Sequence, residues 1–329
     1  MSTPERVEAH HRFAVFWGGG LGDVLVLRPL LMALAGRLRH PPLFFTTAYH
    51  LEGLFESLGL EVQLHVLPTA PLDALKVFRG LGRRLDWIYL GPHPRLKTRL
   101  LARVIGAERI WSVQHPDADV FIGEQVLADV RALDLAGPSA AALPYGGAWS
   151  KAPDQPTQGY LVFHPGAKPR WETTRWPSDH WRELIRRVLA ESTLELCLVG
   201  TGSERELLDS LVADLPASSR ARIRMDTQLS LPELGNLLVA SRGVVCHNSG
   251  VLHLAAMLRR PTVAVTGSSA RSWRPPYAHV ANVTSGTCEL ACNQYRCPVP
   301  FYRARCIRLL EVETVMQAMR ERLMAADGR

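Results

Sequence analysis

The sequence predicts an α/β protein made of two doubly wound domains, each with a parallel sheet covered by helices. In both halves of the chain, apolar runs of strand length alternate with helical patterns, and this alternation is typical of parallel sheets covered on both faces. The stretch 143–158 is rich in Pro, Gly and polar residues and is the best linker candidate. We therefore expect domains at 1–150 and 151–329, with ligands in a cleft between them at the carboxyl ends of strands.

The N-terminal half alternates strands and helices before two further strands. We expect strands at 13–17, 43–47, 62–67 and 87–90, and helices at 24–38 and 51–58. The C-terminal half repeats the alternation, with strands at 160–164, 194–199, 243–246 and 262–265 and helices at 180–190, 204–215, 231–240 and 251–258. A last helix is expected at 312–324, and it is long enough to pack back across the first domain.

Composition restricts the class of protein. The 329 residues are 47% hydrophobic and 21% charged, values typical of a soluble globular protein. No apolar run reaches the roughly 18–20 residues that span a bilayer, and the start lacks the apolar segment of a signal peptide. We therefore expect a cytoplasmic protein.

A glycine-rich turn with a carboxylate follows the first strand. Gly18, Gly20 and Asp23 break the dinucleotide-binding fingerprint, which needs Gly or Ala where Asp23 stands, and no P-loop signature follows. The turn, with Gly20 and Gly22, leaves Asp23 at a helix start, where N–H groups and the helix dipole keep a carboxylate ionised, as a general base must be. The alternative is that Asp23 only begins the helix.

Three glycine-bearing turns follow strands of the second half and predict a nucleotide site. The first turn and the segment after it carry cations that can neutralise a diphosphate. In the second turn, Glu204 can accept hydrogen bonds from a ribose. The third turn precedes a helix whose free N–H groups favour an anion, although an ordinary capped crossover helix would look the same. The predicted donor-site residues of the second half are Lys168, Arg170, Arg175, Gly200, Glu204, Asn248, Ser249, Gly250 and His253. Gly20 and Gly22 of the glycine-rich turn in the first half are assigned to the same site.

The motifs together resemble a known family. The chain is similar to glycosyltransferase family nine, the heptosyltransferases of lipopolysaccharide assembly, which have the two-domain GT-B fold. The similar segments are LGD with Asp23 and Pro29, the HPGA to HW segment at 164–181, the turn at 200–204, and the stretch 248–267. The resemblance implies an inverting transfer of heptose from ADP-heptose to an acceptor hydroxyl, with no cofactor required for catalysis. It also implies an N-terminal acceptor domain and a C-terminal donor domain.

Site residues are carried over by position. Asp23 matches the family's catalytic base, and Ser249, Gly250 and His253 match donor-site residues near the diphosphate.

Two positions depart from the family pattern. Asn248 stands where the turn usually has Asp, and Thr174 stands where a Lys usually precedes Trp-Pro. The resemblance therefore leaves open which of Lys168, Arg170 and Arg175 supplies the cation.

Basic residues crowd the stretch 76–103 in a chain with a net charge of +7. Because acceptors in the family carry carboxylates and phosphates, we expect Arg95, Lys97 and Arg99 to bind an anionic glycolipid. Such an acceptor would allow peripheral contact with the inner membrane. The alternative is a solvated face. No nucleic-acid module is recognisable, and aromatics are not interleaved with the basic residues, so nucleic acid is not an expected partner.

Four of the six cysteines cluster within nineteen residues, at Cys288, Cys292, Cys297 and Cys306. Four thiolates can bind Zn²⁺ or iron tetrahedrally as a structural site, although the spacing differs from that of zinc knuckles. Free thiols are the alternative, and disulfides are disfavoured in the cytoplasm. Cys197 and Cys246 lie in apolar strands and are expected to be buried.

Three other functions remain open beside lipopolysaccharide heptose transfer. The first is heptosylation of a protein of the autotransporter type, with a metal at the cysteines. The second is a pseudoenzyme that binds a nucleotide sugar, which the departures at Asn248 and Thr174 would fit. The third is an assembly module joined through the cysteine cluster.

Overall fold

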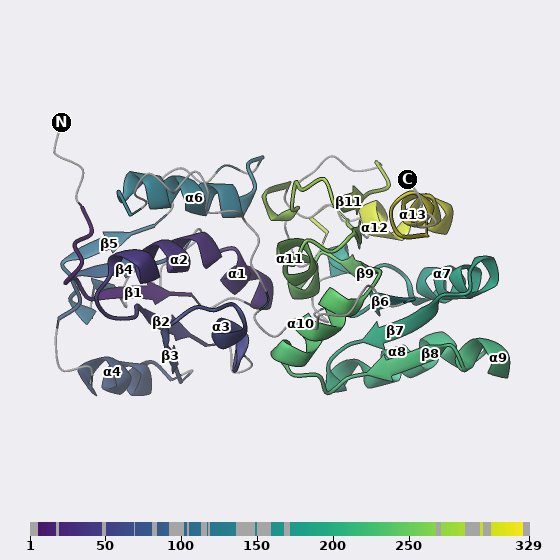
Figure 1. Cartoon of the computed structure of the whole chain (residues 1–329), viewed down its shortest axis with the longest axis horizontal. Coiled ribbons are helices and arrows are strands. Elements are labelled where there is room, and N and C mark those ends of the chain that lie inside the picture. Colours follow the sequence, from purple (N-terminus) through teal and green to yellow (C-terminus); the bar gives the residue numbers. More distant parts are fainter. Residues whose placement is uncertain are drawn as a thin grey trace. The chain divides into compact units, whose positions relative to one another are not determined.

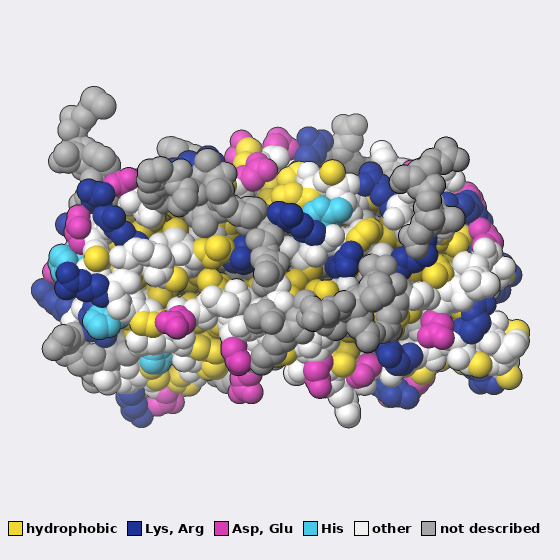
Figure 2. All heavy atoms as spheres, viewed as in Figure 1, with side chains coloured by type: hydrophobic (Ala, Val, Ile, Leu, Met, Phe, Trp, Pro, Cys, Tyr) yellow, Lys and Arg dark blue, Asp and Glu magenta, His cyan; other side chains and the backbone are white. Residues whose placement is uncertain are grey.

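The computed structural model forms two compact units, Met1–Ser150 and Lys151–Arg329. It describes residues 6–17, 20–47, 51–68, 70–80, 84–91, 102–103, 105–112, 117, 119–135, 149, 159–167, 172–267, 271–286, 297–298 and 304–324. Each unit contains one parallel sheet with helices on both of its faces (Figure 1). On the face drawn in Figure 2, the basic and acidic side chains of the described residues are interspersed over both units.

The first sheet has five parallel strands in the order β3-β2-β1-β4-β5. Their bounds are β1 Phe13–Phe16, β2 Leu43–Thr46, β3 Gln63–Val66, β4 Trp87–Tyr89 and β5 Arg109–Trp111. The chain runs outward from β1 to β3 and then returns to the other side of β1. Ligands of doubly wound sheets bind at such a reversal, so the residues after β1 occupy the favoured position of this unit.

Helices cover the first sheet on both faces. Their bounds are α1 Leu21–Leu25, α2 Arg28–Arg37, α3 Leu54–Ser57, α4 Pro71–Gly80 and α6 Ile122–Ala132. Phe78 of α4 packs on Phe16 and Phe45 from one face. From the other face, α6 approaches the sheet, and the Tyr89 hydroxyl donates to Asp129 Oδ2 at 2.9 Å.

The helix expected at 24–38 is divided into α1 and α2. Pro29 lies in the first turn of α2. Because proline has no N–H, it cannot donate the hydrogen bond that would continue α1, and it favours the start of a new helix instead. The consequence is that Asp23 belongs to a separate short helix at the sheet's reversal.

The second sheet has six parallel strands in the order β11-β10-β9-β6-β7-β8. Their bounds are β6 Tyr160–His164, β7 Glu195–Val199, β8 Ile223–Asp226, β9 Gly243–His247, β10 Thr262–Val265 and β11 Val280–Val283. The order reverses between β6 and β9. The turns that follow these two strands therefore lie next to each other.

The helices of the second unit pack on both faces of its sheet. The α-helices are α7 Ser178–Glu191, α8 Arg205–Val212, α9 Ala217–Arg220, α10 Leu231–Ala240, α11 Gly250–Met257, α12 Arg305–Arg308 and α13 Val312–Met319. The 3₁₀ turns are η2 Glu172–Thr174, η3 Gly202–Glu204 and η4 Arg271–Trp273, and the π-helical turn η5 Arg320–Met324 continues α13. Trp181 of α7 and Met316 of α13 are buried in one hydrophobic cluster that also contains Leu161 and Phe163 of β6. No helix in the described part of the chain is long and apolar enough to cross a bilayer.

Candidate functional site

The candidate donor site of the second unit lies where β6 and β9 end. The two strands are paired, with His164 opposite Cys246. Beyond them, Ser249 Oγ lies 3.4 Å from His164 Nδ1, and His247 Nδ1 lies 3.2 Å from the Gly166 carbonyl oxygen. The two turns that the sequence marked as separate motifs are therefore in direct contact.

The helix α11 begins directly at this contact. Ser249 is its N-cap residue in an extended conformation, and its side chain makes no cap hydrogen bond. The first N–H groups of a helix lack intrahelical acceptors and, with the helix dipole, attract an anion. The segment 248–250 thus has the geometry expected of a phosphate-binding turn.

His253 lies one turn into α11 and is buried, with 2% of its surface exposed. Its ring packs edge-on against Trp273 with centroids 5.9 Å apart. Burial lowers the pKa of His253 to about 4. At neutral pH the imidazole is therefore uncharged, and it supplies packing at this turn rather than a cation.

The turn after β7 brings a carboxylate to the same place. Glu204 Oε2 accepts hydrogen bonds from the Thr201 N–H at 2.8 Å and the Thr201 hydroxyl at 3.0 Å. The carboxylate lies directly over Gly166, where a Cβ atom would stand 2.1 Å from Glu204 Oε1. Any side chain larger than that of glycine at position 166 would therefore displace the Glu204 carboxylate from this position.

His164 is in the electrostatic field of that carboxylate. Burial lowers the pKa of His164, and the nearby negative charge of Glu204 partly opposes that shift. The neutral ring is the dominant form at neutral pH, so the described donor turns hold a carboxylate beside an uncharged imidazole.

The segment before α7 supplies one described cation. Arg175 is exposed, whereas Thr174 is buried with 7% of its surface exposed. The residue that stands in place of the usual Lys therefore does not reach solvent. Lys168 and Arg170 lie outside the described residues.

Asp23 occupies the third position of α1 in the first unit. Its Oδ2 atom accepts a hydrogen bond from the Gly20 N–H at 2.5 Å, which closes the backbone start of the helix. The side chain is half-buried, and Gly22 beside it is buried. Asp23 thus fixes the helix start at the reversal of the first sheet, and the carboxylate is held there by an N–H donor.

The residues predicted to bind the acceptor, Arg95, Lys97 and Arg99, lie outside the described residues. At the start of the same basic stretch, Lys76 is mostly exposed and pairs with Asp73 at 2.8 Å. That residue therefore fits the solvated-face interpretation.

The cysteine cluster is described in part. Cys288 and Cys292 lie outside the described residues, while Cys297 is half-buried, Cys306 is buried and neither forms a disulfide. Within the described residues, no three His, Cys, Asp or Glu side chains come together as metal ligands would. Cys197 and Cys246 are buried, as expected.

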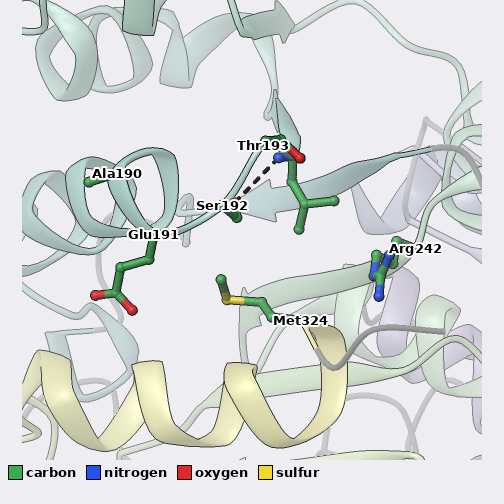
Figure 3. A pocket seen from close by; sticks show the side chains of 7 residues that line it. Ala190, Glu191, Ser192, Thr193, Arg242 and Met324 are labelled. Carbon is green, nitrogen blue, oxygen red and sulfur yellow. Dashed lines mark hydrogen bonds between the residues drawn. The ribbon is translucent and has the colours of Figure 1, made fainter. Parts of the chain in front are cut away.

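A cavity of about 510 Å³ lies where the strands of the second sheet begin, opposite the turns that follow them (Figure 3). It lies between the end of α7, the start of β7 and the end of the π turn, and Glu191, Arg242 and Met324 are among its lining residues. Since β7 and β9 begin at this edge, the cavity is separated from the turns that follow the strands. It is not part of the candidate donor site.

The sequence motifs did not reveal how the turns are held together. His247 is in none of the predicted sites, but it is completely buried and bonded to Gly166 and Trp176. A histidine that ends an apolar strand was the available signal, and its partners could not be inferred without the strand order.

Similarity to known proteins agrees with this geometry. Residues 130–302 match the profile of glycosyltransferase family 9 (heptosyltransferase). Lipopolysaccharide heptosyltransferase 2 of Escherichia coli is 32% identical over 124 residues, which are 37% of this chain and 35% of that protein. The chain therefore matches about a third of the length of its curated relatives.

Solved structures show the same fold. A family 9 glycosyl transferase from Veillonella parvula superimposes with a TM-score of 0.72 at 16% identity, covering 98% of this chain and 100% of that one. An E. coli heptosyltransferase solved with ADP-2-deoxy-2-fluoro heptose gives a TM-score of 0.61 at 20% identity, covering 94% and 99% of the two chains. The chain therefore belongs to glycosyltransferase family 9 (heptosyltransferase) and has the GT-B fold of two parallel-sheet α/β domains.

Proposed function

We propose that this protein transfers a heptose, or a related sugar, from an ADP-sugar to an acceptor hydroxyl with inversion, as a step of lipopolysaccharide core assembly. In this proposal the unit 1–150 binds the acceptor and carries the base, and the unit 151–329 binds the donor. Its cytoplasmic location, with peripheral contact at the inner membrane, belongs to the same proposal.

The observation that carries the proposal is the meeting of three turns at the reversal of the second sheet. The turns after three different strands supply Gly166, Glu204 and Ser249. Glu204 lies against Gly166, and Ser249 lies against His164. Of the three, Ser249 is the N-cap residue of α11, whose first N–H groups suit a diphosphate. Glu204 keeps one carboxylate oxygen, Oε1, directed over Gly166, and this oxygen is suited to accept from a ribose hydroxyl.

The proposed mechanism uses Asp23 as general base. Asp23 takes the proton of the acceptor hydroxyl as its oxygen forms a bond to the anomeric carbon. The bond from that carbon to the diphosphate oxygen breaks, and ADP leaves with the electron pair. The start of α11 and the guanidinium of Arg175 stabilise the negative charge that develops on the leaving group. The carboxylate of Asp23 also favours the positive charge that develops on the sugar ring.

A direct test measures turnover and binding together. Turnover would be followed with ADP-heptose and a heptose-deficient core glycolipid, and binding by thermal shift with ADP, UDP, GDP and CDP. A ligand at about 100 times its Kd stabilises the fold by roughly 2.7 kcal/mol. We expect stabilisation by ADP and sugar transfer to the glycolipid, and a response to another nucleotide would refute the ADP-sugar assignment.

A second candidate is a pseudoenzyme that binds a nucleotide sugar without transferring it. The observation in its favour is that Thr174 is buried, so the usual cation of the family is missing at that position. Binding of ADP-heptose without turnover on glycolipid or protein acceptors would favour this candidate. A structural metal at the four cysteines, and with it a protein acceptor, stays a prediction tested by elemental analysis.

A further inference from the structure

His247 is a fully buried polar side chain at the end of β9, with 0% of its surface exposed. Its Nε2 atom accepts hydrogen bonds from the Trp176 backbone N–H at 2.9 Å and from the Trp181 indole N–H at 3.3 Å. Its Nδ1 atom lies 3.2 Å from the Gly166 carbonyl oxygen. Both ring nitrogens are therefore engaged, and each contacts a different segment of the second unit.

The partners fix the tautomer of this ring. Peptide and indole N–H groups can only donate, so Nε2 must carry the lone pair. A carbonyl oxygen can only accept, so Nδ1 must carry the hydrogen and donate to Gly166. Burial lowers the pKa of His247 to about 3; the hydrogen bond to the Gly166 carbonyl opposes this shift, and the nearby His164 and Arg175 add to it. The ring is therefore neutral at neutral pH, and this tautomer can make the hydrogen bonds to all three partners.

The segment that His247 holds is anchored on its other sides as well. The Trp176 indole N–H donates to the Leu310 carbonyl at 2.8 Å. The Thr173 carbonyl oxygen lies so close to Gly267 that a Cβ there would stand 2.1 Å away. Within this frame, Arg175 is exposed next to the pinned Trp176. The backbone position from which the Arg175 side chain extends is therefore held by the hydrogen bond that the Trp176 N–H donates to His247.

We propose that His247 is a positioning residue for donor binding, which fixes the segment carrying Arg175 and the turn at Gly166 relative to the start of α11. One imidazole links the ends of two neighbouring strands to the segment before α7. The next residues in the chain, Asn248 to Gly250, form the phosphate-binding turn itself. The role in donor binding rests on the proposed function, whereas the link among the three segments does not.

Side chains of matched size can separate the two halves of this link. Gln at 247 can place an amide oxygen near the position of Nε2, which keeps the bond from Trp176 and loses the bond to Gly166. Asn can place an amide N–H near the position of Nδ1, which keeps only the bond to Gly166. Leu fills much of the volume and keeps neither. Ser241→Ala serves as a control, because it removes a buried hydrogen bond to Leu238 just before β9, at the opposite edge of the sheet.

The experiment measures KM and kcat for ADP-heptose and the hydrogen exchange of the Trp176 amide in the full chain. We expect His247→Leu to raise KM about ten-fold, with a smaller change in kcat, and to lose protection of the Trp176 amide. His247→Gln should retain that protection and most of the affinity, and His247→Asn should resemble the Leu variant in exchange. Ser241→Ala should lower the melting temperature without changing KM or the exchange of this amide.

Two results would overturn the proposal. If His247→Leu destabilises the fold but leaves KM and Trp176 exchange as they are in Ser241→Ala, His247 is only a packing residue. If His247→Gln fails to restore Trp176 protection, the Nε2 bond is not what holds the segment. A wild-type protein that neither binds nor turns over ADP-heptose would refute the proposed function instead, and the exchange measurements would still decide whether His247 holds the segment.

Discussion

Replacing Gly166 by Ala tests whether the turns after β6 and β7 meet as described. The new Cβ would lie 2.1 Å from Glu204 Oε1 and 2.8 Å from Oε2, so the carboxylate must move. Moving it breaks the two hydrogen bonds from Thr201 that close the start of η3. Loss of such a cap costs about 1 kcal/mol. The carboxylate would also leave the position proposed for the ribose, and we expect donor affinity to fall about ten-fold.

A double-mutant cycle measures how much of the effect of Gly166→Ala depends on the Glu204 side chain. A Glu204→Ala background removes the three atoms nearest to the new Cβ, all of them in the Glu204 carboxyl group, and the backbone of Gly166 is not in the left-handed region that favours glycine. Gly166→Ala should then stabilise the fold by about 0.4–1 kcal/mol, because Ala lowers the entropy of the unfolded chain. Chemical denaturation of the four proteins gives the free energies of unfolding. If Gly166→Ala destabilises the protein equally in both backgrounds, Glu204 does not occupy that space.

Four further predictions follow from the sites. Asp23→Asn should keep the hydrogen bond from Gly20 and the binding of ADP while turnover falls about 10²–10⁴-fold, whereas near-normal turnover would exclude Asp23 as base. The buried His247 and His253 have pKa values of about 3 and 4, below the unfolded value, so the unfolded state binds more protons. Stability should therefore fall as pH drops from about 6.5 toward 4, by roughly 1.4 kcal/mol per pH unit for each ring, and His247→Gln should reduce the slope of denaturation free energy against pH. Charge reversal at Arg95 and Arg99 should raise the KM of the glycolipid acceptor and leave donor binding unchanged, and an unaltered acceptor KM would return the basic stretch to the solvated-face interpretation. Elemental analysis of protein purified without chelator should find stoichiometric zinc or iron if Cys288, Cys292, Cys297 and Cys306 bind a structural metal, and its absence would favour free thiols.

The strands β6 and β10 have the expected bounds, since strands buried on both faces appear as short apolar runs. The helix α10 also has the expected bounds, and Ser230 and Glu233 form a capping box at its start. The strand β8, Ile223–Asp226, is an edge strand with no fully buried residue. It lacks such a run and was therefore missed, as was the three-residue edge strand β5.

One helix that the sequence analysis did not predict has an apolar pattern that could have revealed it. The helix α6 buries Ile122, Val126 and Val130, which recur every four residues along the chain. That spacing is typical of an amphipathic helix, so this element could have been predicted from the sequence alone.

The site could be predicted only as a set of separate turns. Sequence marks Gly166, Glu204 and Ser249 as residues after strands, because each turn is local. Their contact depends on β6 lying between β7 and β9, and strand order is not encoded by any local pattern. The same dependence hides the role of His247, whose partners are 66 to 81 residues away in the chain.

The two departures from the family pattern compensate each other in charge. The resemblance places a carboxylate at position 248 and an ammonium group at position 174, whereas this chain has the neutral side chains of Asn248 and Thr174. Losing one charge of each sign leaves the net charge of the donor turns unchanged. In the proposed donor site, the electrostatic attraction for a diphosphate would then depend on the start of α11 and on nearby cations such as Arg175. A turn that relies on backbone N–H groups depends more on how its loops are positioned, and this is the property that His247 and Gly166 control.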